Sequence, residues 1–470
     1  MSPTELLAHF SLVLGLMWGG YLLLLGAWIV LQKREPIATV SWLLALALLP
    51  VIGLLIYHLL GPQRIHRQRL RRLRARAGLQ RALPAFVASG EDRASLARLA
   101  QASAGLPQST ASAVELLVGG AATYDALLQA IASARQHVHL EYYIVEPDHS
   151  GLALRDALVE RAAAGVQVRL LLDGFGSSRL GLAFLAPLAA AGVEIAWFHP
   201  LHLRRLWRPR INLRNHRKLV VIDGDTAFAG GINIHDEADA RRHAAAHQDL
   251  HLRLQGRVVR WLQLCFIEDW YYAGGRLPRS DALWPGLPRG AIAAQVVTSG
   301  PDAPWEAIHR VMVEAIHQAG RRVWLVTPYF VPGEAARMAL TSAALRGLDV
   351  RLLLPRRSDS RIVSAAARSY YDELLAAGVR IFEYRPSLLH SKALLIDAEL
   401  CLLGSANFDM RSFRLNFELG LLLQDRTLAT QLEAVIESDL QHSDEITSTA
   451  DKRLPARLGE ACARLLSPLL

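Results

Sequence analysis

Two histidine-containing segments hold the residues best suited to chemistry in this chain. The first reads NHRKLVVIDGDTAFAGGIN and the second reads LHSKALLIDAELCLLGSAN. In both, the histidine precedes a lysine by two positions, an aspartate by seven, a glycine by fourteen and an asparagine by seventeen. Because five positions match in two copies, chance is a poor explanation for the pattern. The candidate catalytic residues are His216, Lys218, Asp223, His390, Lys392 and Asp397.

These residue types suit chemistry at a phosphodiester. Residues two apart in a strand point to the same face, so each His and Lys should project together. An imidazole titrates near neutrality, and a lysine supplies positive charge where phosphoryl oxygens become more negative. Asn233 and Asn407 follow small residues that permit close approach, and their amides can bind the same oxygens. Asp223 and Asp397 end their strands, where aspartate is common in turns, which favours a structural role for them.

The elements that must position these segments occur twice along the chain. Short apolar runs alternate with helical stretches, which is typical of an α/β domain. VQVRLLLDG from Val166 matches DVRLLLP from Asp349, and VEIAWFHP from Val193 matches VRIFEYRP from Val379. Such long offsets, between 174 and 186 residues, indicate a duplicated domain. The expected strands are 138–145, 166–173, 193–198, 218–222, 323–331, 349–354, 379–384 and 392–396.

We therefore predict two homologous α/β lobes, each a mixed sheet flanked by helices, over residues 115–290 and 291–470. The length of 470 residues fits more than one domain. The net charge of +9 suits an anionic partner but does not separate phospholipid from nucleic acid. The three cysteines are widely spaced without a CxxC pair, so the sequence indicates neither a disulfide framework nor a zinc site.

The first sixty residues are much more apolar than the rest of the chain. No Asp, Glu, Lys or Arg lies between Leu6 and Gln32, or between Pro36 and Pro62. Each stretch can cross a hydrocarbon core of about 30 Å as a helix. A signal peptide is the alternative for the first stretch, but its leader MSPTELLAHF has no Lys or Arg. We predict a transmembrane hairpin over residues 1–62, with helices at about 8–32 and 37–60.

A run of arginines follows this hairpin. Seven arginines lie within residues 64–76, whereas the connection between the two apolar stretches carries Lys33, Arg34 and Glu35. The positive-inside rule then places both termini in the cytoplasm. We predict a multi-pass protein of the bacterial inner membrane with catalytic lobes facing the cytoplasm and a basic linker over residues 63–114. The arginines can contact anionic headgroups or form a solvated linker.

Two further segments have an amphipathic composition. The cluster LHLRRLWRPR, residues 201–210, combines arginines with a tryptophan just before the first motif. We interpret it as a membrane-surface contact, with a solvated loop as the alternative. In the C-terminal segment, leucines from Leu454 to Leu466 lie on one helical side, so it can lie on the membrane or pack on a lobe.

At the paired motifs the sequence resembles the phospholipase D superfamily, whose mark is two HKD motifs. The segments TPYFVP from Thr327, GSANFDMRSF from Gly404 and LNFELG from Leu415 are similar to bacterial cardiolipin synthases. The twin apolar N-terminal stretches and the ending ARLLSPLL are similar as well. The motif resemblance covers nearly the whole chain after residue 110.

The resemblance implies a two-step exchange through a phosphohistidine. One histidine attacks phosphorus, while the other protonates the leaving alcohol and then deprotonates the incoming one. Family analogy favours His216 as nucleophile and His390 as acid and base, although the two roles are formally interchangeable. It also implies orienting carboxylates, Glu418 for His390 and Asp249 for His216. Neither a cofactor nor a metal is implied.

One stretch departs from the family pattern. Where the family usually has Trp-Arg-Asp-x-His, this chain has HQDLH, which keeps Asp249 and His251 but lacks the Trp-Arg pair. The loop GINIHDEADARRHAAAH also lacks the expected aromatic residue after Asp-Glu. We interpret both departures as altered contacts to the headgroup or the acceptor.

The activity implied is that of a cardiolipin synthase, in which two phosphatidylglycerol molecules give cardiolipin and glycerol. The expected partners are phospholipid and membrane. A phospholipase D or another phosphatidyltransferase is the nearest alternative, since only the acceptor differs. A membrane-tethered nuclease is a further alternative, but superfamily nucleases are often single-motif homodimers, so no nucleic-acid partner is expected. The two intact motifs argue against a non-catalytic scaffold.

Overall fold

The computed structural model of the chain describes residues 3–31, 36–49, 52–55, 57, 95–200, 213–278, 280–449 and 454–467. The chain forms two compact units. One contains residues 1–64 and 202–212, and the other contains residues 65–201 and 213–470. The arginine-rich segment 64–76 and the basic cluster 201–210 both lie outside the described residues.

The first unit is built on two apolar helices, α1 (Pro3–Leu31) and α2 (Pro36–Leu48). Within α1, residues 12–31 have a mean hydropathy of 1.9 and are long enough to cross a membrane. Within the described residues α2 is a shorter apolar helix of 13 residues. Several residues of the predicted second span, 37–60, lie outside the described ones. Among the described residues, one helix is therefore long and apolar enough to cross a membrane, and the predicted two-helix hairpin is not confirmed.

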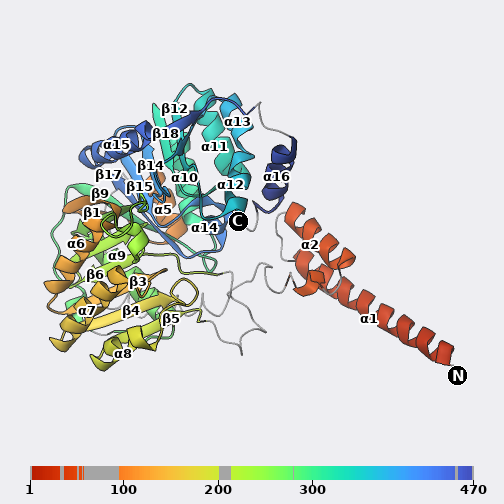
Figure 1. Cartoon of the computed structure of the whole chain (residues 1–470), viewed down its shortest axis with the longest axis horizontal. Coiled ribbons are helices and arrows are strands. Elements are labelled where there is room, and N and C mark those ends of the chain that lie inside the picture. The colour runs from red at the N-terminus through yellow and green to blue at the C-terminus, as the bar shows by residue number, and fades with distance from the viewer. Residues whose placement is uncertain are drawn as a thin grey trace. The chain divides into compact units, whose positions relative to one another are not determined.

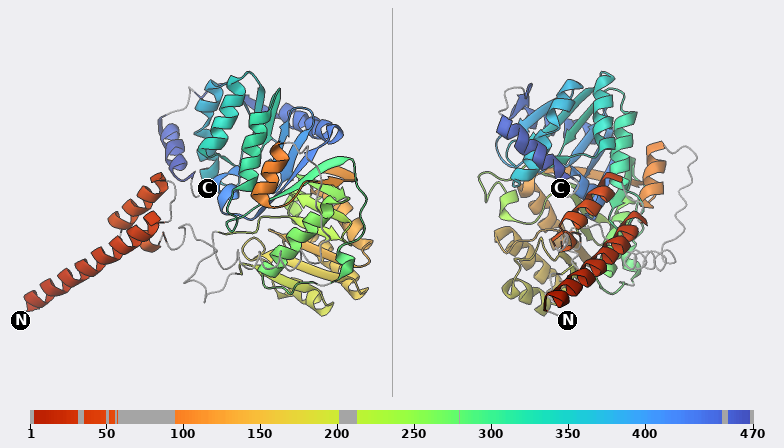
Figure 2. Two further views of the ribbon diagram at one scale, coloured as in Figure 1. Left: turned by 180° about the vertical axis from the view of Figure 1, so that it is seen from behind. Right: turned by 90° about the vertical axis from the view of Figure 1, so that its right-hand side faces the viewer.

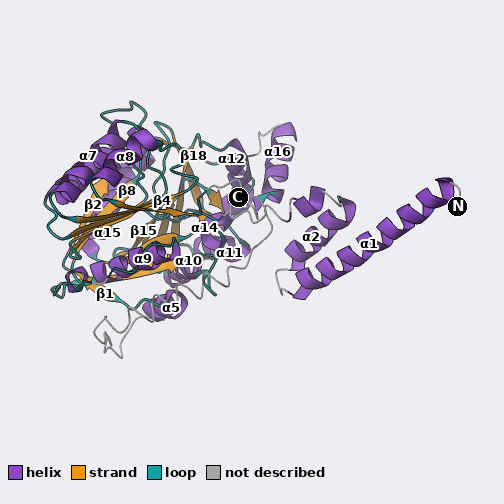
Figure 3. Ribbon diagram, turned by 90° about the horizontal axis from the view of Figure 1, so that it is seen from below, coloured by secondary structure: helices purple, strands orange, loops and turns teal. Residues whose placement is uncertain are grey.

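The first lobe is a seven-stranded mixed sheet with helices on its faces (Figures 1 and 3). Strand β3 pairs in parallel with β4 and antiparallel with β6. The strand order is β2-β8-β7-β6-β3-β4-β5. The strands are β2 (Ala113–Val118), β3 (His137–Tyr142), β4 (Gln167–Asp173), β5 (Glu194–Phe198), β6 (Leu219–Ile222), β7 (Thr226–Gly230) and β8 (Leu250–Gln255). The helices are α6 (Gly119–Ala132), α7 (His149–Ala163), α8 (Leu182–Ala190), η2 (Asp236–Ala238), α9 (Val258–Tyr272) and η3 (Asp281–Leu283).

The second lobe repeats this plan in a nine-stranded sheet of order β1-β9-β17-β15-β14-β10-β12-β13-β18. Here β10 pairs in parallel with β12 and antiparallel with β14, as β3 does with β4 and β6. The strands are β1 (Ser109–Ala111), β9 (Ile292–Ser299), β10 (Arg322–Val326), β12 (Asp349–Pro355), β13 (Arg380–Tyr384), β14 (Ala393–Ile396), β15 (Leu400–Gly404), β17 (Glu418–Gln424) and β18 (Ser443–Ile446). A separate parallel pair joins β11 (Phe330–Val331) to β16 (Phe408–Asp409). The helices are α5 (Ser95–Ala104), α10 (Ala307–Gln318), α11 (Glu334–Leu345), α12 (Arg361–Arg368), α13 (Tyr371–Ala376), α14 (Met410–Arg414), α15 (Arg426–Gln441) and α16 (Leu454–Leu465).

The predicted mixed α/β architecture with helix-flanked sheets is confirmed, while the exact domain boundaries remain predictions. Part of the predicted linker belongs structurally to the second lobe. Strand β1 pairs with β9, and α5 contacts α10 (Figure 1). Four of the ten residues of α5 are buried, which explains why this segment packs as a helix.

The two lobes lie against each other (Figure 2). They share one hydrophobic core between their sheets. Leu219 and Val221 of β6 and Leu395 of β14 belong to this shared core. Their strand neighbours Val220 and Leu394 face the separate outer cores of the two lobes. Strands buried on both faces are continuously apolar, as LVVI and ALLI are. This packing fixes the two motif-bearing strands relative to each other.

The C-terminal helix α16 packs on the second lobe. The Arg464 guanidinium lies 4.4 Å from the centre of the Tyr370 ring, and the Tyr370 hydroxyl is 2.9 Å from Ser467 Oγ. Leu454, Leu458 and Leu465 remain exposed. The sequence left open whether the C-terminal helix lies on the membrane or packs on a lobe, and packing on a lobe is observed. The exposed leucines form an apolar surface on α16 that no described residue covers.

Candidate active site

Each motif histidine is held by backbone pairing with the other lobe. His216 N donates to Phe417 O at 3.0 Å, and Phe417 N donates to Arg214 O at 2.8 Å. His390 N donates to Gln248 O at 2.7 Å, and Gln248 N donates to Leu388 O at 3.0 Å. Both histidines thus lie in extended segments just before β6 and β14 rather than within those strands. The crossed pairing positions two similar half-sites at the contact of the lobes.

Each imidazole contacts a carboxylate from the opposite lobe. His216 Nδ1 lies 3.0 Å from Glu418 Oε1, and His390 Nδ1 lies 2.6 Å from Asp249 Oδ2. The predicted assignment, Glu418 to His390 and Asp249 to His216, is therefore wrong. Within one lobe, β7 separates β6 from β8, and β15 separates β14 from β17. Neighbouring strands are about 4.8 Å apart, so the carboxylate of the same lobe, two strands away, is too distant to contact the histidine. Packing of the lobes brings the carboxylate of the opposite lobe to the histidine instead.

Burial and charge make the site strongly polarised. Burial raises the pKa of Asp249, but Lys392 and His390 outweigh it and lower that pKa to about 2. Burial likewise opposes ionisation of Glu418, yet His216 and Lys218 lower its pKa. Both carboxylates are therefore ionised at neutral pH.

The imidazoles are neutral in this environment. Burial lowers the pKa of His216, and burial together with Lys392 lowers that of His390 to about 3. A neutral imidazole that donates its Nδ1 proton to a carboxylate keeps a lone pair on Nε2. Each half-site can therefore present a nucleophilic or basic nitrogen.

The lysines bring positive charge to both half-sites. Lys218 Nζ donates to His216 O at 2.7 Å, and Lys392 Nζ lies 2.8 Å from His390 Nδ1. Burial lowers the pKa of Lys218 to about 7 and that of Lys392 to about 8. Each lysine also lowers the pKa of the histidine in the other lobe, so the predicted His and Lys residues share one electrostatic environment.

Asp223 and Asp397 are not placed with the imidazoles. Asp223 accepts hydrogen bonds from the backbone N–H groups of residues 135–137 at 2.8–2.9 Å. Asp397 accepts three from residues 320–322 at 2.8–3.0 Å. Both have a positive φ, near 50°, at the ends of β6 and β14 away from the histidines. This geometry favours the structural role for these aspartates, because their oxygens accept the backbone N–H groups at the start of β3 and β10.

Asn233 and Asn407 are both buried after β7 and β15. Asn233 Oδ1 accepts a hydrogen bond from Ile144 N at 3.3 Å. Asn407 Oδ1 is buried without a hydrogen-bond partner among the described residues. Their predicted contact with phosphate oxygens stays a prediction.

In each motif, a small residue follows the glycine fourteen positions after the histidine and lies against the carboxylate that contacts an imidazole. A Cβ added to Gly231 would lie 2.2 Å from Asp249 Oδ1. At the matching position, Ser405 Oγ donates to Glu418 Oε2 at 2.5 Å. Glycine thus makes room for one carboxylate, while serine binds the other.

Sequence reasoning missed several residues around the first half-site. The Tyr143 ring lies 4.9 Å from the His216 ring and 5.3 Å from Lys218 Nζ. Arg217 Nη1 pairs with Asp269 on α9, and Asn215 donates to Glu141 within β3. Glu141 could have been identified from the sequence, because a charged residue inside a buried, largely apolar strand needs a partner.

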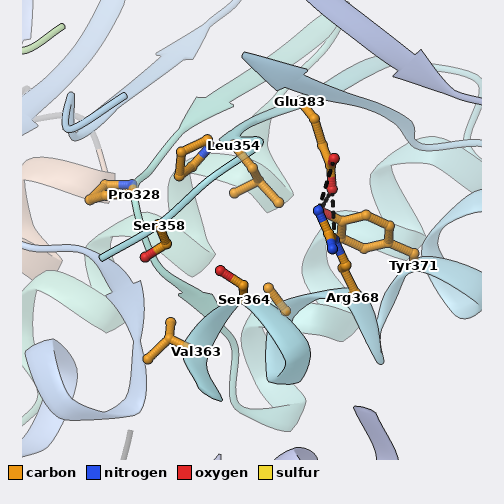
Figure 4. Close-up of a pocket in the computed structure, with 10 residues that line it drawn as sticks. Pro328, Leu354, Ser358, Val363, Ser364, Arg368, Tyr371 and Glu383 are labelled. Carbon is orange, nitrogen blue, oxygen red and sulfur yellow. Dashed lines mark hydrogen bonds and ion pairs between the residues drawn. The ribbon is translucent and has the colours of Figure 1, made fainter. Parts of the chain in front are cut away.

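A small pocket near the carboxyl ends of β10 and β12 does not belong to this site (Figure 4). It is lined by Pro328, Leu354 and Ser358, among others, and Arg368 pairs with Glu383 at its side. Its volume of about 10 Å³ corresponds to roughly one water molecule. The pocket is therefore too small for a lipid headgroup.

Two family models and several known proteins match this chain. The family described as "Cardiolipin synthase, PLD-like domain" matches residues 127–254 and 312–440, and a "Phospholipase_D-nuclease N-terminal" family matches residues 22–62. A cardiolipin synthase of Geobacillus kaustophilus is 41% identical over 94% of this chain and 91% of that protein. One of Alkalihalophilus pseudofirmus is 39% identical over 95% and 92%.

A solved structure supports the fold alone. The phosphatidylserine synthase of Haemophilus influenzae superimposes with a TM-score of 0.61 at 15% identity, covering 80% of this chain and all of that one. By the matches over most of its length, the chain belongs to the cardiolipin synthase family, and with it to the enzymes that transfer phosphatidyl groups.

Proposed function

We propose that this protein is a cardiolipin synthase that transfers a phosphatidyl group from one phosphatidylglycerol to another, releasing glycerol. The observation that carries the proposal is the crossed arrangement of His216 with Glu418 and His390 with Asp249. It supplies two oriented imidazoles, while Lys218 and Lys392 add charge for the phosphate. The substrate is a phospholipid in a membrane.

In the first step, His216 Nε2 forms a bond to phosphorus while the bond from phosphorus to the glycerol oxygen breaks. The protonated His390 gives its proton to that oxygen, and glycerol leaves. In the free site, burial and Lys392 hold His390 neutral. An anionic phosphate near Lys392 offsets that charge, so substrate binding favours the protonated form of His390.

In the second step, the glycerol hydroxyl of another phosphatidylglycerol attacks the same phosphorus. Neutral His390 accepts the hydroxyl proton as the bond from His216 to phosphorus breaks, which restores the protonated His390 with which the substrate-bound enzyme began the first step. Asp249 stabilises His390 when it is charged, and Glu418 keeps the His216 ring oriented. Asn233 and Asn407 are proposed to bind the phosphoryl oxygens.

The deciding experiment is incubation of purified, detergent-solubilised protein with phosphatidylglycerol, without CDP-diacylglycerol or divalent metal. Lipids and glycerol are then measured by mass spectrometry. We expect cardiolipin and glycerol in equal amounts. Phosphatidic acid without cardiolipin would instead identify a phospholipase, and an absence of both products would overturn the proposal and direct attention to other headgroups and to nucleic acid.

The order of the histidines is tested by trapping the intermediate. After rapid acid-free quenching with phosphatidylglycerol, peptide mass spectrometry should find the phosphohistidine on His216. His216→Ala should abolish that adduct. An adduct on His390 in the unmodified protein would reverse the two roles.

We further propose that the N-terminal hairpin spans the bacterial inner membrane twice, with the lobes in the cytoplasm. The long apolar α1 and the arginines at 64–76 support this topology. Cys462 is exposed, whereas Cys265 and Cys401 are buried, so it serves as a natural reporter. A membrane-impermeant maleimide should label Cys462 only after spheroplasts are permeabilised, with Cys462→Ser as control. Labelling of intact spheroplasts would contradict the orientation.

A further inference from the structure

A second cluster of side chains with ligand chemistry lies in the loop between β7 and β8. His235 Nδ1 and His247 Nε2 are each 3.8 Å from Glu237 Oε2. All three ligand atoms lie within 4.8 Å of one another. This cluster, the His235–Glu237–His247 triplet, is separate from the carboxylates that contact the motif histidines.

The backbone holds the triplet in place. His247 N donates to Glu237 O at 2.8 Å, which closes the loop on itself. His235 N lies 3.1 Å from the Tyr124 hydroxyl, which donates to Asn233 O at 2.6 Å. The backbone at His235 and at His247 is therefore positioned by the fold.

The neighbouring acidic residue points elsewhere. Asp236 accepts hydrogen bonds from Ser150 Oγ at 2.7 Å and from Ser150 N at 2.9 Å, and its carboxylate contacts His149 Nδ1 at 2.9 Å. Glu237 has no such anchor to Ser150, and its side chain is 64% exposed. Its carboxylate can therefore turn toward an ion shared with the two imidazoles.

The donor set matches one class of metal ion. Two imidazole nitrogens and one carboxylate oxygen suit zinc-like divalent transition ions better than Mg²⁺ or Ca²⁺, which favour oxygen ligands. Tetrahedral ligands about 2.1 Å from zinc are roughly 3.4 Å apart, and each imidazole nitrogen lies 3.8 Å from the Glu237 carboxylate. Burial lowers the pKa of His235 to about 4 and also lowers that of His247, so neither nitrogen needs to lose a proton first.

The triplet lies beside the active site. The His247 ring centre is 6.0 Å from the His390 ring centre. His247 is also close enough to Asp249 and Lys392 to interact with both electrostatically. A dication held by His247 would therefore lie directly beside the active-site imidazole of His390.

We propose that His235, Glu237 and His247 bind one zinc-class divalent transition-metal ion, and that the bound ion inhibits the reaction by acting on the neighbouring His390. The ion is a regulator here rather than a participant in catalysis. Three protein ligands leave a fourth position of the ion for water or another small ligand.

The site itself is tested by binding, without lipid turnover. Untagged full-length protein in detergent is stripped with a chelator and titrated with ZnCl₂ by calorimetry. We expect one saturable site, with affinity reduced at least about 10-fold in His247→Ala and in His235→Ala. Glu237→Gln, at an exposed position, should also weaken binding without disturbing packing.

His149→Ala is the matched control. His149 is an exposed histidine paired with Asp236 in the same region but outside the triplet, so its loss should leave zinc affinity unchanged. X-ray absorption of the zinc-loaded protein should report two imidazoles in the first coordination shell. Absence of saturable binding, or equal affinity in all four variants, would overturn the site.

Inhibition is tested separately by turnover of phosphatidylglycerol. Zinc should slow the unmodified enzyme and His149→Ala, whereas His247→Ala should be insensitive relative to its own zinc-free rate. Saturable binding with unchanged turnover would overturn the link to His390. The zinc-free rate tests the proposed function independently, so failure of one proposal is distinguishable from failure of the other.

Discussion

In the His390 half-site the lysine lies against the imidazole, whereas in the His216 half-site it does not. Both lysines donate to the backbone carbonyl of their own histidine. Lys392 additionally lies 2.8 Å from His390 Nδ1 and 3.6 Å from Asp249. Lys218 instead lies over the face of Tyr143. Two copies of one motif thus have different electrostatic surroundings.

The carboxylates of the two half-sites, Glu418 and Asp249, also differ in the hydrogen bonds that they receive. Glu418 receives further hydrogen bonds from Ser405 Oγ at 2.5 Å and Asn416 Nδ2 at 3.1 Å. Asp249 instead receives one from Leu250 N at 2.7 Å and lies against Gly231. The two half-sites therefore share one duplicated backbone arrangement, and single side chains around it make their environments unequal. Unequal halves suit a reaction in which one histidine attacks and the other transfers protons.

The largest expected effects come from removing either imidazole. His216→Ala should lower turnover of phosphatidylglycerol by at least about 10⁴-fold, because the nucleophile is lost. His390→Ala should lower it by about 10²- to 10⁴-fold, the usual contribution of a general acid and base. Initial rates measure both, and circular dichroism with gel filtration confirms folding. Near-normal turnover in either variant would refute a shared site.

The crossed carboxylates are tested by a double-mutant cycle. Asp249→Asn should lower turnover by about 10²- to 10⁴-fold, because His390 loses the charge that stabilises its protonated form. The same change should have little further effect in a His390→Ala background but should retain an effect when His216 is replaced. Glu418→Gln should show the opposite dependence. Coupling of Asp249 to His216 would restore the assignment expected within one lobe.

The lysines predict an alkaline limit to activity. Their pKa values, about 7 for Lys218 and about 8 for Lys392, mean that both are charged below pH 7 and lose charge as pH rises. kcat/KM should therefore fall above this window, by up to about tenfold per pH unit. Lys218→Arg should move the alkaline limb to higher pH, because arginine stays charged. A limb that is identical in the variant would show that Lys218 does not set it.

The smallest effect on turnover is expected at Asp223 and Asp397. Replacing either with alanine leaves three backbone N–H groups without their acceptor, which should cost about 1–3 kcal/mol of stability. Apparent melting temperature should fall, while turnover per folded molecule should stay within about threefold. Asparagine is the matched control, because it tolerates a positive φ and keeps one acceptor oxygen. Loss of turnover at an unchanged melting temperature would return these aspartates to catalysis.

Much of the fold could be predicted because it is encoded locally. The expected strands at 166–173, 193–198 and 349–354 agree with β4, β5 and β12 to within one residue at each end. The expected strand 323–331 is instead divided into β10 and β11 around residues 327–329. Strands such as β2 and β9 were not among those predicted from the sequence.

By itself, the sequence determined the duplicated frame, the histidines with their lysines, and the reaction class, because these depend on residue type and short spacing. Only the tertiary structure decided which carboxylate serves which histidine, because an intervening strand separates the carboxylate from the histidine within each lobe, and packing of the lobes brings each histidine to the carboxylate of the other lobe. It also decided that Asp223 and Asp397 hold backbone amides, since their partners are more than 70 residues away in the chain. Folding of the β7–β8 loop likewise brought His235 and His247 together around Glu237, which linear spacing alone does not indicate.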